Sequence, residues 1–360
     1  MWNLTRLAVA DYRDHLDVAF PEDSDPQRVS EAEKDLVLAF YEDYETALGR
    51  PSLALRGENT SQALRQEVHD AYGLVQDGRR LARLRSDLKL LAESCPYCGY
   101  GPIEELDHLL QRAHFKLFSI FPLNLVPSCG TCNKGKRRIP SDNVEEHQLH
   151  VYLEDVSDYD FLRADVTIDV ASGALKPRYH IVQSPGMPVE LYQRLVFHLK
   201  EFDLQARYEK QMNIFLGELE YPITSSYEEG GAQALRRVLT GTAQALRRRF
   251  GANDWRTALM TGLAACAEFY EGGFRTALGL PQVNVGQVAL GNQQSGGKCT
   301  GCHDVIIGAV WAAYEAALHQ LRPRSNASDL SRHGKETGSL TTAEWRVSSR
   351  LVLYAIRGIE

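Results

Sequence analysis

Two Cys-x-x-Cys pairs constrain this chain more than any other feature of its sequence. Cys95 and Cys98 form the first pair, and Cys129 and Cys132 form the second. Four thiolates on two tight knuckles are the ligand set that a structural Zn²⁺ takes in a tetrahedral site. Two unrelated buried pairs are the alternative, and a redox function would need only one Cys-x-x-Cys. The sequence therefore predicts a structural zinc held by all four cysteines.

The chain has 360 residues, enough for two domains or for one domain with a catalytic insert. Its net charge of −7 argues against a protein that coats nucleic acid non-specifically, although a local basic site is compatible with it. Residues Met1–Ala10 do not read as a signal peptide, and the longest apolar run, Val305–Leu318, is too short to span a bilayer. We therefore expect a cytoplasmic protein without a membrane partner, where paired cysteines bind metal rather than form disulfides.

Hydrophobic periodicity divides the chain into four regions and predicts an α+β fold. We expect an N-terminal helical region over 1–92, a small module over 93–140, a mainly helical region over 141–280 and a poorly defined tail over 281–360. The individual elements expected are helices at 30–48, 61–74, 79–91, 188–217, 232–249 and 254–270, a break at 221–226, and a hairpin of strands 161–170 and 176–182.

The segment between the cysteine pairs carries polar residues of a catalytic type. Residues 103–110 read as a strand that ends in Asp107 and His108, and residues 121–127 read as a loop and a second strand that contain Asn124. Asn133 follows the last cysteine, where a helix can begin. Taken singly, each of these residues is more often a surface or turn residue. Their joint spacing is what predicts a site.

This pattern resembles the HNH endonuclease family, in the version whose ββα-metal core is stapled by four cysteines. The family's order of C-x-x-C, D-H, N-L-V-P and C-x-x-C-N-x-x-K is matched throughout, over about 44 of the 360 residues. The chain departs from the prolines expected of close relatives at Gln111 and near Lys116. His114 is an additional histidine, either an exposed loop residue or a helper that contacts substrate or metal.

The resemblance implies a role for each matched residue. His108 would be the general base, and Asn124 would hold the loop that orients it. Asp107 and Asn133 would bind one catalytic Mg²⁺ or Mn²⁺ through oxygen atoms. The basic residues after the second cysteine pair would contact flanking phosphates: Lys134, Lys136, Arg137 and Arg138. From Cys95 to Arg138, six Lys and Arg face three Asp and Glu, which suits a polyanionic substrate.

The resemblance further implies a phosphodiester hydrolase acting on DNA, with RNA as the weaker alternative. Large helical flanks are typical of effector nucleases of bacterial anti-phage defence, which work beside an ATPase partner, and the chain is compatible with an oligomer. Restriction-type and mobile-element nucleases remain alternatives. The non-enzymatic alternative is a catalytically inactive zinc-stapled module that binds nucleic acid or protein.

A second cysteine motif lies near the C-terminus. Cys299, Cys302 and His303 spell C-x-x-C-H, the form used for covalent haem. That attachment requires export, and the sequence shows no export signal. We expect no cofactor there, with a metal site or a redox pair as alternatives.

Overall fold

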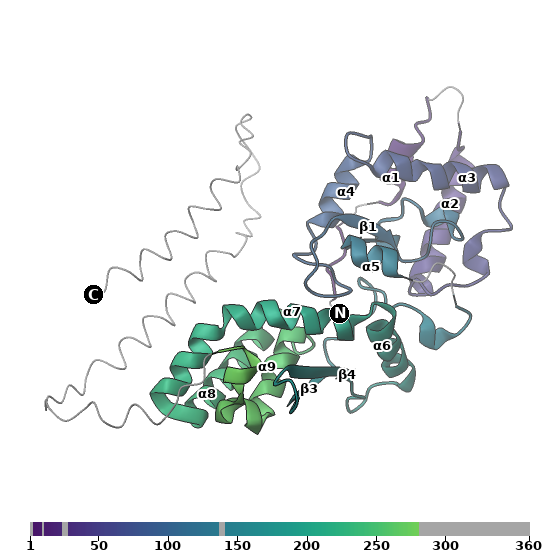
Figure 1. The fold of residues 1–360 in the computed structure, drawn as a ribbon. Coiled ribbons are helices and arrows are strands. Elements are labelled where there is room, and N and C mark those ends of the chain that lie inside the picture. Colours follow the sequence, from purple (N-terminus) through teal and green to yellow (C-terminus); the bar gives the residue numbers. More distant parts are fainter. Residues whose placement is uncertain (1–2, 9–10, 24–27, 137–140, 281–360) are drawn as a thin grey trace, which may run out of the picture. The chain divides into compact units, whose positions relative to one another are not determined.

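The computed structural model describes residues 3–8, 11–23, 28–136 and 141–280. Within this part the chain is α+β and mostly helical, with two small antiparallel sheets of two strands each (Figure 1). All described residues belong to one compact unit, residues 1–284. The predicted boundaries after residues 92 and 140 stay predictions, and the predicted tail over 281–360 lies outside the described residues.

The N-terminal helices confirm the helical periodicity of this region. They are α1 (Arg13–Ala19), α2 (Glu31–Thr46), α3 (Gln62–Asp70) and α4 (Ala82–Lys89), with 3₁₀ turns at Ala54–Arg56 and Ala71–Val75. Ser30 caps α2 in a capping box with Glu33, which satisfies two backbone N–H groups that the helix leaves free. After α2 ends at Thr46, Gly49 adopts the left-handed conformation with φ of 65°, which does not continue a helix. Predicted start and stop signals thus hold for this helix.

The segment between the cysteine pairs forms two short strands followed by a helix. Strand β1 (Glu105–His108) pairs antiparallel with β2 (Leu125–Ser128), so that His108 lies opposite Leu125. Between the strands the chain makes 3₁₀ turns at Lys116–Phe118 and Pro122–Asn124. Helix α5 (Gly130–Gly135) follows β2 directly and contacts β1. This arrangement places the end of β1 and the first turns of α5 next to each other.

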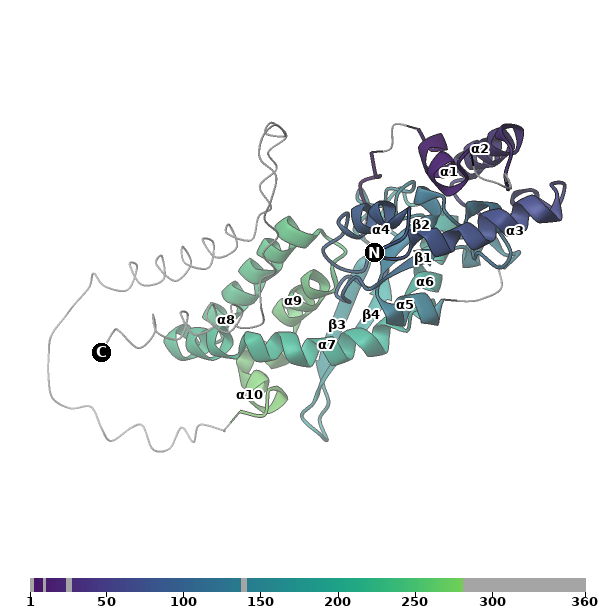
Figure 2. The same cartoon turned by 90° about the horizontal axis from the view of Figure 1, so that it is seen from above.

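The predicted hairpin after the module is confirmed. Strand β3 (Leu162–Ile168) pairs with β4 (Leu175–Ile181), and buried and exposed side chains alternate along β3. Helix α9 (Trp255–Ala265) packs on β3, while α6 (Val189–Glu201) and α7 (Leu204–Glu218) pack on β4 (Figure 2). Gly262 of α9 permits this close approach, because a Cβ atom there would collide with the backbone carbonyl of Ala164.

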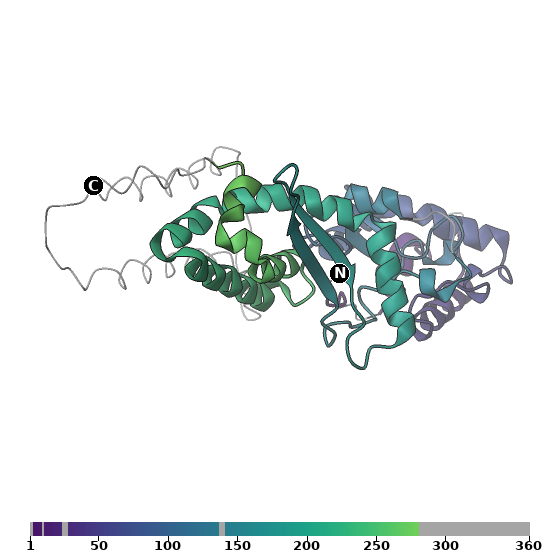
Figure 3. The same cartoon turned by 60° about the horizontal axis from the view of Figure 1, so that its bottom comes forward.

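The helical periodicity predicted over 188–217 is confirmed, but its interpretation as one continuous helix is wrong. The structure has two helices, α6 (Val189–Glu201) and α7 (Leu204–Glu218), seen on either side of a bend in Figure 3. Asp203 sits between them in the left-handed conformation with φ of 48°, which Asp tolerates better than most residues. The apolar periodicity continues through the bend, so the pattern alone does not reveal it.

The predicted break over 221–226 is also wrong. Helix α8 runs from Glu220 to Phe250 and is interrupted instead at Gly230 and Gly231. Pro222 is accommodated because it lies in the first turn, where the helix needs no N–H donor. The remaining elements are α9 (Trp255–Ala265), a π-type turn at Phe269–Gly273, α10 (Phe274–Ala277) and a 3₁₀ turn at Val144–Glu146.

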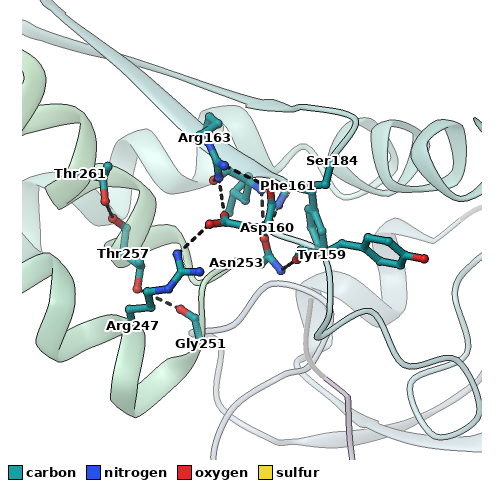
Figure 4. A network of polar contacts seen from close by, with 11 residues as sticks. Tyr159, Asp160, Phe161, Arg163, Ser184, Arg247, Gly251, Asn253, Thr257 and Thr261 are labelled. Carbon is teal, nitrogen blue, oxygen red and sulfur yellow. Dashed lines mark hydrogen bonds and ion pairs between the residues drawn. The ribbon is translucent and has the colours of Figure 1, made fainter. Parts of the chain in front are cut away.

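A polar network secures the start of β3 (Figure 4). The side-chain oxygen of Asn253 accepts hydrogen bonds from the backbone N–H groups of Phe161 and Leu162, at 2.7 and 3.1 Å. Its amide nitrogen donates to the carbonyl oxygen of Tyr159 at 2.7 Å. One side chain therefore satisfies three backbone groups and fixes the loop between α8 and α9 to the hairpin.

Candidate functional site

The four predicted zinc ligands lie together in the structure. Cys95, Cys98, Cys129 and Cys132 are buried, and their sulfur atoms all lie within 4.8 Å of one another. The sulfurs of Cys98 and Cys129 are 3.9 Å apart. A tetrahedral zinc with Zn–S bonds of about 2.3 Å requires sulfurs about 3.8 Å apart. The cluster therefore fits a structural zinc ion.

The backbone around the first pair forms the tight knuckle that such a site needs. The N–H of Gly99 donates to the carbonyl of Cys95 at 2.7 Å, and the N–H of Cys95 donates to the carbonyl of Gly101 at 2.8 Å. The N–H of Gly101 also donates to the Cys98 sulfur at 3.4 Å. A Cβ atom at Gly101 would lie 2.8 Å from the Cys129 sulfur, so only glycine fits there.

Arg207 reaches the cysteine cluster from α7, a contact that sequence reasoning missed. Its Nη1 lies 3.2 Å from the Cys132 sulfur, and its Nη2 lies 3.8 Å from the Cys129 sulfur. Its Nε donates to the Tyr100 hydroxyl at 2.9 Å. Zinc bound by four thiolates carries a net charge of −2, so the guanidinium offsets part of that charge and also orients two ligands.

We therefore expect Arg207→Met to release zinc faster than the wild-type protein. Loss of such a supporting contact weakens metal binding by about 10- to 100-fold in comparable sites. Arg207→Lys retains the charge but not the planar fork, so it should restore only part of the retention. The measurement is the rate of zinc transfer to a chromogenic chelator. Equal rates in all three proteins would show that Arg207 only packs against the cluster.

A cleft of about 400 Å³ brings together most of the predicted catalytic residues. Its lining includes five of them, together with five residues that were not predicted to line it: Asp107, His108, Asn133, Lys134, Lys136, Tyr72, Glu105, Leu106, Gln111 and Arg112. The first strand supplies Asp107 and His108, and α5 with its C-terminal flank supplies the next three. Residues 29 positions apart in sequence thus meet because β1 and α5 pack together.

His108 is held with a defined ring orientation in this cleft. Its Nε2 lies 3.0 Å from the carbonyl oxygen of Ser119. A carbonyl can only accept, so Nε2 carries the hydrogen and Nδ1 has the free lone pair of the neutral ring. The ring of Tyr72 packs edge-on against it with centroids 4.5 Å apart. Burial lowers the pKa of His108 to about 3, so the ring is neutral at physiological pH.

Asp107 is buried and already pairs with a cation. The ammonium of Lys136 lies 2.5 Å from its Oδ2, and the hydroxyl of Tyr97 donates to the same oxygen at 2.8 Å. Burial raises the pKa of Asp107 above its ordinary value, against the opposing effects of Lys136 and Tyr97. Lys136 also donates to the backbone carbonyl of Leu109 at 3.3 Å. Its side chain is 5% exposed, so it is placed beside Asp107 and not at the surface contact predicted for it.

Asn133 lines the cleft and contacts β1 through its side-chain amide. Its Nδ2 donates to the carboxylate of Glu105 on β1, which leaves Oδ1 available as a ligand atom. Glu104, the neighbouring residue, accepts from the N–H of Gly130 at 3.2 Å and so fixes the start of α5. Glu105 was missed because a charged residue on a short strand has no distinguishing pattern in the sequence.

Asn124 is fully buried beneath the cleft and does not line it. Its Oδ1 accepts from the N–H of Leu110 at 2.7 Å, and its Nδ2 donates to the carbonyls of Leu110 and Phe118 at 3.0 and 3.1 Å. Tyr44 of α2 donates to the same Oδ1 at 3.2 Å. These bonds tie both ends of the loop after His108 together, which is the loop-holding position that was expected.

The predicted basic residues are only partly described. Lys134 is exposed at the cleft, while Arg137 and Arg138 lie outside the described residues. Cys299, Cys302 and His303 also lie outside them.

Within the described ranges, no helix is both long and apolar enough to cross a membrane.

His198 of α6 connects the C-terminal helices to the zinc knuckle. Its Nε2 donates to the carbonyl of Tyr97 at 2.8 Å, and burial lowers the pKa of His198 to about 3. Unfolded histidine titrates near 6.5, so the folded chain binds fewer protons and stability falls as pH drops below 6.5. At pH 4.5 the loss is about 2–3 kcal/mol, at about 1.4 kcal/mol per pH unit.

We therefore expect His198→Gln, which retains an N–H donor but does not titrate, to lose less stability in acid than the wild type. The measurement is the free energy of unfolding at pH 7 and pH 4.5 for both proteins. Protonation of the cysteines affects both and cancels in the comparison. An identical acid-induced loss would show that His198 is not buried in the neutral form.

The chain has a relative among proteins already described. Over 150 residues it is 32% identical to Protein ea31 of Escherichia phage lambda. The match covers 40% of this chain and 50% of the relative, so it spans about half of that protein's length. No family model matches the chain, and no solved structure matches it. The name of this relative states no activity.

Proposed function

We propose that this chain is a metal-dependent HNH endonuclease that hydrolyses phosphodiester bonds in DNA. The observation that supports this most is the shared cleft, since Asp107, His108 and Asn133 come from two elements yet line one hollow. The cysteine cluster adjoins the same helix, because Cys132 directly precedes Asn133. Both groups have the residue types and the order of the zinc-stapled module that the sequence resembles.

His108 is the proposed general base. Its Nδ1 lone pair takes a proton from the attacking water, while the Ser119 carbonyl keeps the ring oriented through Nε2. Burial keeps the imidazole of His108 in its neutral form, which is the form whose Nδ1 lone pair can accept a proton. Asn124 acts indirectly. Its hydrogen bonds to the backbone of Leu110 and Phe118 hold the loop that leads from His108 to Ser119.

Asp107 and Asn133 are the proposed ligands of a catalytic Mg²⁺ or Mn²⁺. Both offer the oxygen atoms that such hard cations prefer, and Lys136 and Tyr97 both contact the Oδ2 atom of Asp107, so Oδ1 is the proposed ligand atom. The ion, when bound, would polarise the scissile phosphate and stabilise the leaving oxygen. Lys134, exposed at the same cleft, is positioned to contact a phosphate from the outside.

The alternative is a catalytically inactive module that binds nucleic acid or protein. The presence of Asp107, His108 and Asn133 in one cleft favours the enzyme, since a binding module needs none of them there. The cellular role as effector of an anti-phage defence system, together with an ATPase partner, is proposed from the resemblance of the helical flanks alone. RNA is the less favoured of the two candidate substrates.

The test is nicking of supercoiled plasmid by the purified chain, with its ATPase partner where one is found. We expect conversion to open-circle DNA with Mg²⁺ or Mn²⁺ and none when both ions are left out. Asn133→Ala should need at least about tenfold more metal for the half-maximal rate, because one ligand is lost. Asn213→Ala, on the exposed surface of α7, is the matched control. Folded, zinc-loaded protein that binds plasmid but never nicks it would support the inactive module instead.

A further inference from the structure

A second hollow is lined in part by the same loop that lines the catalytic cleft. Its volume is about 270 Å³, and its lining residues are Arg56, Glu58, Gln62, Arg65, Ala113, His114 and Lys116. The loop after His108 supplies Gln111 and Arg112 to the cleft and the next residues to this hollow. We call it the loop pocket. It also accounts for two residues of the sequence pattern, His114 and Lys116, that the proposed catalytic site leaves without a role.

The loop pocket carries positive charge that nearby carboxylates do not neutralise through ion pairs. Among the described residues, Arg56, Arg65 and Lys116 form no salt bridge, and Glu58 is the single acidic residue of the lining. The Nη1 of Arg65 donates to the carbonyls of Gly57 and Thr60, at 2.8 and 2.5 Å. These contacts hold the guanidinium in place while leaving its charge without a counter-ion.

The other two cations also retain donors for a ligand. The Nε of Arg56 is buried without a hydrogen-bond partner. The ammonium of Lys116 donates one of its three N–H groups to the side-chain oxygen of Gln66, at 2.9 Å. A buried donor without a partner is unfavourable, so a ligand that accepts hydrogen bonds would stabilise this arrangement. Such a site suits a compact anion with several acceptor oxygens.

We propose that the loop pocket binds a backbone phosphate of the nucleic acid, near the phosphate that is cleaved. The proposal rests on the proposed function, which places the scissile phosphate in the adjoining cleft. Phosphates near the scissile one along a strand would meet this loop as the strand leaves the cleft. Arginine and lysine are the residues that contact backbone phosphates most often, and neutral donors such as Gln62 add to such contacts.

Phosphate binding here would also support the base. The hydroxyl of Ser119 donates to the carbonyl of Lys116 at 2.6 Å, and the Ser119 carbonyl accepts from His108. A phosphate held by Lys116 therefore restrains the backbone that orients the imidazole. Lys116 is accordingly a positioning and substrate-binding residue, and its loss should raise KM more than it lowers kcat.

The test measures binding of a labelled DNA duplex by fluorescence anisotropy, in a His108→Ala background without added Mg²⁺ or Mn²⁺. Each phosphate contact contributes about 0.9 to the slope of log affinity against log salt. We expect Lys116→Ala to reduce the slope by about 0.9, and Lys116→Arg to restore it. Lys210→Ala removes the same charge from the exposed surface of α7 and should leave the slope unchanged.

Each outcome decides the matter. An unchanged slope in Lys116→Ala, an equal reduction in Lys210→Ala, or no binding of the duplex would overturn the proposal. Binding of millimolar inorganic phosphate that Lys116→Ala abolishes, together with an unchanged salt slope for the duplex, would identify a free-phosphate site and overturn it as well. A reduced slope in a chain that never nicks plasmid would refute the proposed nuclease and leave the loop pocket standing.

Discussion

His108→Ala should reduce plasmid nicking by about 10²–10⁴-fold, the usual contribution of a general base. The reason is geometric: His108 lines the cleft beside Asp107, and its Nε2 is bound to a backbone carbonyl, so that Nδ1 remains for the water. The measurement is the initial nicking rate at saturating Mg²⁺ or Mn²⁺. DNA affinity should change much less than the rate, because the imidazole is neutral and adds no charge to binding.

His180→Ala is the matched control for this variant. It removes a histidine from β4, outside the cleft, and should nick at the wild-type rate. Zinc content and the thermal midpoint of His108→Ala need to stay near those of the wild type, since the Tyr72 ring packs on His108 and loses a neighbour. Equal nicking by His108→Ala and the wild type would eliminate the proposed mechanism.

Local patterns predicted much of the secondary structure. Ser30 and Glu33 marked the start of α2, and the alternating segments on either side of Ser172 and Gly173 marked the β3–β4 hairpin. The spacing of the cysteines predicted a metal-sized cluster, which the structure places together. These features depend on residues close in sequence or on ligand chemistry that limits the alternatives.

The missed features depend on contacts between distant segments. Arg207 contacts a cysteine 75 positions away, and Asp107 is paired with Lys136, whose role as a surface phosphate ligand was expected from the sequence. A lysine at the end of a short helix looks the same in sequence whether it faces solvent or a buried carboxylate. The bend at Asp203 was missed for a related reason. Both α6 and α7 follow the helical period, and their packing on β4 involves residues that are distant in the sequence.

Replacement of Cys95 and Cys129 by serine should abolish zinc binding and unfold the module. The two residues belong to different knuckles, at the N-terminal end of the module and at the start of α5, so the metal joins segments that the short β1–β2 pair alone holds weakly. Structural zinc in small sites contributes about 10–16 kcal/mol of apparent binding free energy at pH 7. Few changes elsewhere in the chain should cost as much.

Metal analysis of the wild type should give about one tightly bound zinc per chain, and the double variant should give none. Cys266→Ser is the matched control, because Cys266 lies outside the cluster at the end of α9 and should leave both zinc content and stability nearly unchanged. Hydrogen exchange should show the largest loss of protection in β1, β2 and α5.

Nicking should disappear in the double variant for a different reason than in His108→Ala. Asn133 and Asp107 would no longer meet, because α5 loses the cysteines that hold it beside β1. Well-folded wild-type protein without zinc would show that β1, β2 and α5 are held together by the apolar core alone and not by a metal ion.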